Sequence, residues 1–257
     1  MNDRLLQCNK TARILNVPFT CCSIDEILKR IDQRINDSSG SGYISITNTE
    51  SLYFAVRIPS HFQYVEYADF SCCDGIGIVI GGKMLGIKIP RIHGPDLFLK
   101  CCKFGADKGW RHFFYGGRKG VPELLSEKLK KNIPDLITCG MYSPPFRKLT
   151  SKEDQKIIDL INEANPDILW VGLGLLKQES WIAEHLGKIK VPWMVGVGAA
   201  FDFHAGTIKR APRIFRKTGL EWLYRLTFEP RMLKRNFYSF LVVLQLANEA
   251  LYRRNQH

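Results

Sequence analysis

Asp74 stands immediately before a glycine, in the segment Cys73-Asp-Gly-Ile-Gly77. Glycine lets a backbone turn tightly and approach a ligand closely. A carboxylate held in such a turn can serve as a general base that removes a proton from a substrate hydroxyl. An aspartate at this position can instead cap the turn that follows it. Asp74 is therefore a candidate base, with a turn-capping role as the alternative.

A second candidate segment follows an apolar run in the last third of the chain. Gly174 precedes Lys177 and Gln178, which stand where a helix is predicted to begin. Helix N-termini attract phosphate because their N–H groups are unpaired and the helix dipole is positive there. Both side chains can also donate hydrogen bonds to phosphate oxygens. The alternative for Gln178 is a residue of the first helical turn that faces solvent.

Several motifs that would indicate other chemistry are missing. The chain has no Gly-x-x-x-x-Gly-Lys-Ser/Thr phosphate loop and no Gly-x-Ser-x-Gly nucleophile elbow, which argues against a nucleotide triphosphatase and a serine hydrolase. It has no Asp-x-Asp pair to hold a divalent ion on a nucleotide-sugar diphosphate. We therefore expect no metal and no cofactor, with cationic side chains or backbone N–H groups holding any diphosphate.

A loose dinucleotide fingerprint lies in the segment Gly75-Ile-Gly77-Ile-Val-Ile-Gly81, with its third glycine one residue late. A single near-match of this kind is a weak signal. It leaves a pyridine-nucleotide oxidoreductase as a lesser alternative.

The charge of the chain is concentrated near its C-terminus. From Thr207 to His257 there are eleven Lys and Arg against three acidic residues, which accounts for +8 of the net +12. Aromatic residues alternate with these charges, and such a helical segment can lie in a membrane interface. A terminal helix that packs its apolar face on the core is the alternative. Basic residues interleaved with aromatics also suit nucleic acid, so a nucleic-acid-binding protein is the runner-up function.

The predicted elements alternate between short apolar strands and amphipathic helices. Ser23-x-x-Glu26 and Thr150-x-x-Glu153 are capping boxes that predict helix starts. This alternation predicts an α/β fold with a mostly parallel sheet and helices on both faces. Ligands of such folds bind outside the carboxyl ends of the strands. The predicted strands are residues 43–47, 112–115, 168–171 and 193–197.

The length of the chain and the positions of its cysteines further limit the class of protein. A chain of 257 residues with 45% hydrophobic content suits one large globular domain or a domain with an appendage. Three pairs of its eight cysteines are adjacent in sequence, and no Cys-x-x-Cys occurs. We therefore expect free thiols in a reducing, cytoplasmic protein, without zinc. We find neither a signal peptide nor an apolar run of about 18 residues.

The chain strongly resembles the WecG/TagA/CpsF glycosyltransferase family from about Thr47 to Arg235. The resemblance is carried by six segments in order, residues 73–77, 172–181, 196–203, 209–213, 219–225 and 229–231. The resemblance implies an inverting, metal-independent bacterial enzyme. It would move a hexose-type sugar, often N-acetylmannosamine or its uronate, from a UDP-sugar to an undecaprenyl-diphosphate-linked saccharide for a surface polysaccharide. It also implies a Rossmann-like catalytic core, residues 1–205, and a basic, helical, membrane-associating appendage, residues 206–257. The enzyme would be peripheral on the inner face of the cytoplasmic membrane.

The resemblance also implies roles for individual residues. Asp74 would be the general base, and Arg225 and Arg231 would neutralise the departing UDP. The implied partners are the UDP-sugar, the lipid-linked acceptor and an anionic membrane, without nucleic acid and with a homo-oligomer possible. Substrate contacts would come from Thr47, Asn48, Gly75, Gly94, Gly116, Gly117, Gly174, Lys177, Gln178 and Asp202. Membrane contacts would come from Lys209, Arg210, Arg213, Lys234 and Arg235.

The chain departs from the family pattern at two positions. Leu176 replaces the proline that usually precedes Lys-Gln-Glu, so we expect a less constrained loop before Gln178. His93 replaces a threonine in the segment Arg91-Ile-His-Gly94, either as a ligand or as a packed histidine. Both changes bear on the choice of donor sugar and leave the reaction class unchanged.

Overall fold

Among the residues that the structure describes, the central element is a sheet of six parallel strands. The computed structural model describes residues 11–37, 39–209, 211–212, 215, 221–226 and 232–254. The strands are β3 (Gly42–Thr47), β4 (Phe70–Cys73), β5 (Arg111–Gly116), β6 (Ile137–Tyr142), β7 (Ile168–Gly172) and β8 (Trp193–Gly196). Their order across the sheet is β4-β3-β8-β7-β5-β6.

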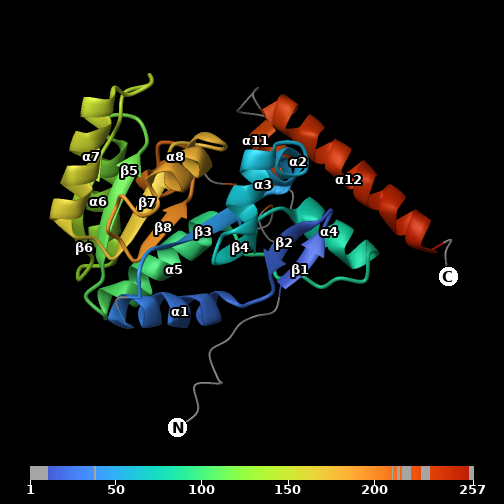
Figure 1. Cartoon of the computed structure of the whole chain (residues 1–257), viewed down its shortest axis with the longest axis horizontal. Coiled ribbons are helices and arrows are strands. Elements are labelled where there is room, and N and C mark those ends of the chain that lie inside the picture. Colours follow the sequence, from blue (N-terminus) through green and yellow to red (C-terminus); the bar gives the residue numbers. More distant parts are fainter. Residues whose placement is uncertain are drawn as a thin grey trace, which may run out of the picture.

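Helices cover both faces of this sheet, so the predicted Rossmann-like α/β class is confirmed (Figure 1). One face carries α1 (Ile24–Asp37), α5 (Gly94–Ala106), α6 (Val121–Asn132) and α9 (Ala200–Ala205). The other carries α2 (Thr49–Ala55), α3 (Pro59–Glu66), α4 (Ile76–Met84), α7 (Ser151–Ala164), α8 (Lys177–His185), α12 (Met232–Arg254) and the antiparallel hairpin of β1 (Thr11–Ile14) and β2 (Val17–Thr20). A short helix, α11 (Glu221–Leu226), contacts α12.

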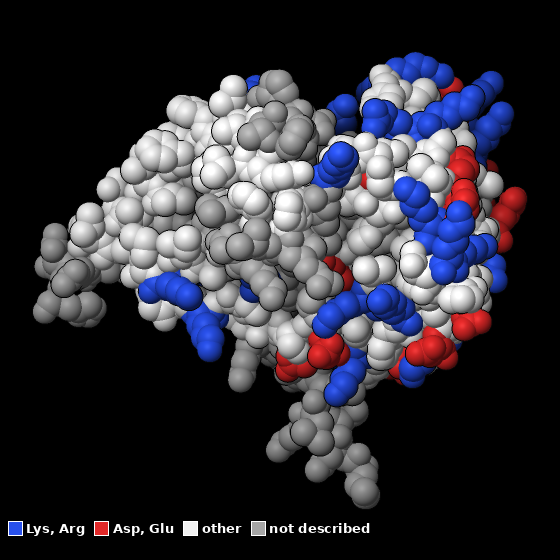
Figure 2. All heavy atoms as spheres, turned by 180° about the vertical axis from the view of Figure 1, so that it is seen from behind, with Lys and Arg blue, Asp and Glu red and all other residues white. Residues whose placement is uncertain are grey.

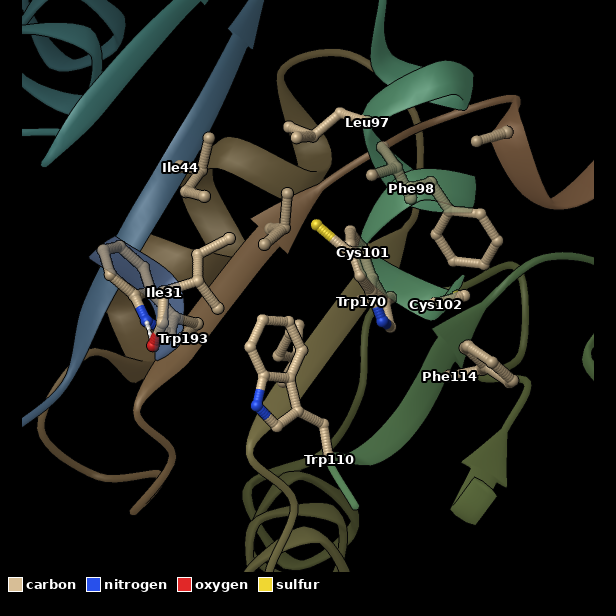
Figure 3. Close-up of a cluster of buried hydrophobic side chains, with 14 of the residues drawn as sticks. Ile31, Ile44, Leu97, Phe98, Cys101, Cys102, Trp110, Phe114, Trp170 and Trp193 are labelled. Atoms are coloured by element: carbon tan, nitrogen blue, oxygen red, sulfur yellow. Dashed lines mark hydrogen bonds between the residues drawn. The ribbon is translucent and has the colours of Figure 1, made fainter. Parts of the chain in front are cut away.

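The strands are apolar on both sides because both of their faces are covered. Phe114 and Trp170 point into one core, where Trp170 lies edge-on to Phe98 of α5 (Figure 3). Their sequence neighbours Phe113 and Leu169 point into the other core. Successive strand side chains alternate between faces, so continuous apolar runs are what a doubly covered parallel sheet requires.

Both predicted capping boxes are confirmed. The backbone N–H of Glu26 donates to Ser23 Oγ, and the Glu26 carboxylate accepts from the Ser23 backbone N–H at 2.7 Å. Thr150 and Glu153 make the same reciprocal pair at the start of α7. These contacts satisfy N–H groups that the first helical turn leaves unpaired.

The C-terminal helix α12 packs on α2 and α4. Its Val242 and Leu246 are fully buried in the same core as the strands. Cβ atoms added to Gly77 and Gly81 would press against Val243 and Leu246. The glycines of the loose dinucleotide fingerprint therefore allow close helix packing at α12. No described helix is long and apolar enough to cross a membrane.

Six of the seven described cysteines are free thiols, as the sequence predicts. Cys72, Cys73, Cys101 and Cys102 are free and buried, and burial raises the pKa of each thiol. Cys22 is disulfide-bonded, so the expectation is wrong at that residue. Adjacent buried thiols with raised pKa values are unreactive because the thiolate is the nucleophilic form.

Candidate active site

A cavity of about 730 Å³ lies outside the carboxyl ends of β3, β4, β7 and β8. It has the size of a small-molecule site and the position at which parallel α/β sheets bind ligands. Residues that follow the four strands form its floor, and α12 with Trp222 of α11 forms its opposite wall. Predicted site residues in the lining are Asn48, Asp74, Gly75, Gly94, Gly174, Gln178 and Arg235.

Asp74 enters the cavity directly after β4. Its backbone N–H donates to the Thr47 carbonyl at 3.0 Å, which continues the ladder between β3 and β4. Its own carbonyl accepts from Arg91 Nε at 3.0 Å. The side chain is 19% exposed, and its Oδ1 lies 3.8 Å from His93 Nε2. The backbone around Asp74 is therefore fixed while its carboxylate faces the cavity.

Close packing beside Asp74 explains the glycine that follows it. A Cβ on Gly75 would lie 2.5 Å from Thr49 Oγ1 and 2.8 Å from Thr49 N. Thr49 begins α2, which Asn48 caps by accepting a hydrogen bond from Ser51 N at 2.9 Å. A side chain at position 75 would push α2 away and displace Asn48 from the cavity wall.

Gln178 is buried in the first turn of α8, so the solvent-facing alternative is wrong. Its Oε1 accepts from Gly198 N at 3.0 Å, and its Nε2 donates to Glu179 Oε1 at 3.1 Å. These two contacts fix which end of the carboxamide points to which neighbour. They also tie the start of α8 to the loop that follows β8.

Glu179 accepts the hydrogen bond from Gln178 and so helps to fix its carboxamide. The sequence did not identify Glu179 as a site residue. Its side chain is buried, and burial raises the pKa of its carboxyl to about 7, although hydrogen bonds partly oppose this. A charged residue beside a helix start resembles an ordinary solvent-exposed residue in sequence. Only the surrounding fold removes it from water.

Arg235 projects from α12 into the cavity wall, where its Nε lies 3.3 Å from Glu50 Oε2. Burial raises the pKa of the Glu50 carboxyl, and the positive charges of Arg235 and Lys234 oppose that rise. The sequence places Arg235 with the membrane-contacting residues. The structure instead places Arg235 in the cavity lining, because α12 packs on α2 and α4 beside the ends of the strands.

Other predicted substrate residues lie outside the cavity lining. Thr47 is fully buried, with its hydroxyl 3.0 Å from Ser45 Oγ. Gly116 is the last residue of β5 and Gly117 follows it, and β7 separates this strand from β8. Lys177 is exposed at the start of α8.

Asp202 also lies outside the lining, and its carboxylate contacts two neighbouring side chains. Oδ1 accepts from the Thr207 hydroxyl at 2.7 Å and lies 3.4 Å from Arg118 Nη2. The position of Asp202 therefore does not support the prediction that it contacts the substrate.

The predicted cationic residues divide between described and undescribed parts of the chain. Arg225 belongs to α11, but its side chain is not among those that the structure describes. Arg231, Arg210 and Arg213 lie outside the described residues. Lys209 and Lys234 are exposed, as a membrane contact requires.

Three lining residues were missed or left open by sequence reasoning. Arg91 was quoted only as part of a segment, yet it lines the cavity and holds the Asp74 carbonyl. His93 lines the cavity beside Asp74. Trp222 closes the wall from α11. Arg91 and His93 lie in the loop between α4 and α5, where no strand end marks them in the sequence, and Trp222 depends on tertiary packing.

Leu176 adopts φ 67° and ψ −37° immediately before α8. A proline ring fixes φ near −65°, so a proline could not adopt this conformation. The departure from the family pattern at this position therefore changes the turn that leads to Gln178. Leu175, the residue before it, lines the cavity.

The sequence profile of the Glycosyl transferase WecG/TagA/CpsF family matches residues 12–256. The chain belongs to the WecG/TagA/CpsF glycosyltransferase family. As a member of this family it is a glycosyltransferase, and its cavity is the candidate active site. Family membership thereby favours the enzyme over the nucleic-acid-binding and oxidoreductase alternatives.

Several curated members of the WecG/TagA/CpsF family are similar along most of this chain. An N-acetylglucosaminyldiphosphoundecaprenol N-acetyl-beta-D-mannosaminyltransferase of Bacillus spizizenii is 30% identical over 88% of this chain and 86% of its own length. The protein of that name from Bacillus subtilis is 28% identical over 93% of this chain and 94% of its own length. One from Staphylococcus aureus is 28% identical over 86% of each chain.

Proposed function

We propose that this protein is an inverting glycosyltransferase that moves an N-acetylhexosamine from a UDP-sugar to an undecaprenyl-diphosphate-linked saccharide. The observation that carries the proposal is the cavity in which Asp74, Asn48, Gln178 and Arg235 converge at the ends of parallel strands. The names of the similar Bacillus and Staphylococcus proteins support the lipid-linked acceptor and the amino sugar. N-Acetylmannosamine is therefore the first donor sugar to test.

Asp74 performs the proton transfer in this proposal. Its carboxylate removes the proton of the acceptor hydroxyl as that oxygen attacks the anomeric carbon of the donor. The new C–O bond forms on the face opposite the bond to UDP, which breaks and leaves UDP with the electron pair. Inversion follows from this single displacement. The Arg91 contact at the backbone and the nearby His93 ring fix the position of the base.

Cationic and polar groups around the cavity stabilise the departing diphosphate. Negative charge grows on UDP as the glycosidic bond breaks, and preorganised donors are worth most where charge develops. Arg91 and Arg235 line the cavity, and Gln178 is held rigid at its edge. Arg225 and Arg231 stay predicted contributors. We propose that these groups act without a metal, so transfer should persist in excess EDTA.

The outer face of α12 suits a membrane surface. Leu233, Phe237, Leu244 and Leu251 are exposed at spacings of four and seven residues, which places them along one side of a helix. Lys234 is exposed on the same helix. Basic residues near an anionic surface add about 1 kcal/mol each. Peripheral association with the inner face of the cytoplasmic membrane would bring the cavity to a lipid-linked acceptor.

Substitution of the base tests this reaction. Asp74→Asn keeps the size of the side chain but removes the basic carboxylate, so transfer should fall by about 10²–10⁴-fold. The assay measures release of UDP and product mass with UDP-N-acetylmannosamine, UDP-glucose and UDP-glucuronate as donors. Transfer by Asp74→Asn within tenfold of wild type would contradict the assignment of the base.

Asp159→Asn is a matched control, because Asp159 lies on the exposed side of α7, away from the cavity. It should transfer sugar at the wild-type rate. Absence of transfer by the wild-type protein with every UDP-sugar and lipid-diphosphate acceptor would contradict the proposed function itself.

A further inference from the structure

The cavity changes from polar to apolar along its length. Asp74 and Arg91 line it where β4 ends. Further along α4 the lining residues are Ile76 and Ile80, which share one side of the helix because they are four residues apart. They place apolar side chains over about 6 Å of the helix axis.

The facing helix α12 shows the same change. Arg235 and Asn236 line the cavity in its first turns, Ser239 follows, and Phe240 and Val243 line the next turn. Along both segments, the polar lining residues therefore come first and the apolar ones follow within one to two turns.

The two helices run in the same direction where they touch. Gly77 packs against Val243, and Gly81 packs against Leu246, so residue numbers rise together on both. The missing side chains at these glycines let α12 approach α4 closely. Consequently the two apolar segments lie beside each other and lead away from Asp74 together.

The apolar segment opens to the surface. Ile80 is 49% exposed and Phe240 is 57% exposed, although both line the cavity, so they form its rim. Met84 on α4 and Leu244 on α12 continue the exposed apolar surface one turn beyond them. Seen from behind, the side of the molecule at which α12 ends is largely uncharged among the described residues (Figure 2).

We propose that this apolar rim binds the first isoprene units of the acceptor, while the polar end of the cavity holds its diphosphate and sugar. The inference rests on the proposed function and adds a lipid subsite to it. We call Ile76, Ile80, Phe240 and Val243 the prenyl subsite. A prenyl diphosphate has an anionic head followed by an apolar chain. The cavity matches this order, because Arg91 and Arg235 can contact the diphosphate and the apolar rim can contact the chain.

The continuity of the rim with the cavity favours this occupant over two others. A second copy of the chain could cover the exposed part of the rim. A bulk membrane lipid could contact the outer surface. Neither would account for apolar side chains that line the cavity interior, such as Ile76 and Val243.

Binding of farnesyl diphosphate tests the subsite without any sugar transfer. The wild-type protein should bind farnesyl diphosphate more tightly than inorganic diphosphate in titration calorimetry. Ile80→Ser and Phe240→Ser should each weaken farnesyl diphosphate binding about tenfold, the effect of losing contact with about two methylene groups. Their binding of inorganic diphosphate should stay unchanged.

Phe146→Ser is the matched control, because Phe146 is an 85% exposed aromatic residue that does not line the cavity. It should bind both probes as the wild type does. Circular dichroism melting checks that all variants fold. We expect them to fold because the substituted side chains are exposed.

Four outcomes would overturn the subsite. The first is equal wild-type affinity for farnesyl diphosphate and inorganic diphosphate. The second is unchanged farnesyl diphosphate binding in both rim variants. The third is a loss of binding to acceptor-free vesicles without an effect on farnesyl diphosphate, which would make the rim a membrane contact. The fourth is a self-association in ultracentrifugation that the rim variants abolish. Transfer from a UDP-sugar would still be measured separately, so failure of the subsite is distinguishable from failure of the proposed function.

Discussion

Glu179 couples burial and proton binding beside the candidate active site. One of its carboxylate oxygens accepts from Gln178, and the other, Oε2, is buried without a hydrogen-bond partner among the described residues. An ionised carboxylate in this position is poorly solvated. The folded protein therefore binds a proton at Glu179 more tightly than the unfolded chain does, and the protonated acid can still accept the hydrogen bond that orients Gln178.

The proton bound by Glu179 should make the free energy of unfolding depend on pH. The pKa of Glu179 is raised from 4.5 to about 7, so between these pH values the folded state binds more protons than the unfolded state. The contribution of Glu179 to stability thus falls as pH rises from about 4.5 to about 7. Glu179→Gln removes this loss. The free energy of unfolding of the variant, relative to wild type, should rise by roughly 3 kcal/mol between pH 4.5 and pH 8.

Urea unfolding at both pH values measures this difference. Glu184→Gln provides the control for the change from carboxyl to carboxamide, because Glu184 is exposed on the same helix. A Glu179→Gln difference that is independent of pH would show that folding does not raise the pKa of Glu179.

At the scale of elements, the turn before α8 sets the position of Gln178. Leu176 has a positive φ of 67°, a conformation that costs a non-glycine residue about 1–3 kcal/mol. The contacts of Gln178 with Gly198 and Glu179 hold the start of α8 against this strain. The turn is therefore determined by packing around α8 and against the local preference of leucine.

Substitutions at Leu176 should separate strain from loop order. Leu176→Gly should stabilise the protein by about 1 kcal/mol, because relief of strain exceeds the entropy that glycine adds to the unfolded chain. Leu176→Pro should destabilise it, because the ring cannot reach a positive φ. Thermal unfolding measures both. Leu186→Gly is the control, since Leu186 ends the same helix at φ −60° and should only lose stability.

A higher melting temperature for Leu176→Pro would contradict this description of the turn. It would mean that the segment adopts the negative φ that proline favours. The donor specificity of that variant would then also be of interest, because Leu175 lines the cavity.

At the scale of the whole molecule, α12 is both part of the core and a surface. Its Val242 and Leu246 are buried against the rest of the fold. Its Leu233 and Phe237 are exposed on the opposite side. Because one helix carries both, association with a membrane would place the cavity wall at the bilayer surface without a separate tether.

Vesicle binding tests this arrangement. Phe237→Ser should weaken binding to vesicles of phosphatidylglycerol and phosphatidylcholine roughly tenfold, since burial of one aromatic side chain is worth about 1.5–3 kcal/mol. Binding should also weaken with added salt, because ions screen the attraction between the basic chain and anionic lipid. Co-sedimentation measures both effects. Equal binding to vesicles of phosphatidylcholine alone would argue against an electrostatic contribution.

Local sequence patterns predicted part of the sheet and part of the cavity floor. Capping boxes located the starts of α1 and α7, and apolar runs followed by glycine located the ends of β5, β7 and β8, whereas β4 and β6 were not predicted. Asp74 was found because glycine follows it in a predicted turn, and Gln178 because it stands at a predicted helix start. These features depend on neighbours in sequence, which is why they could be predicted.

Tertiary structure alone decided which strand ends share a cavity and what closes it. Gly116-Gly117 has the same local pattern as Gly174, but the strand order moves it out of the cavity lining. Arg235 became a cavity residue, and Glu179 a buried acid, because helices distant in sequence pack over them. Sequence periodicity gives the apolar face of a helix, whereas its partner and its direction depend on how all the elements fill space together.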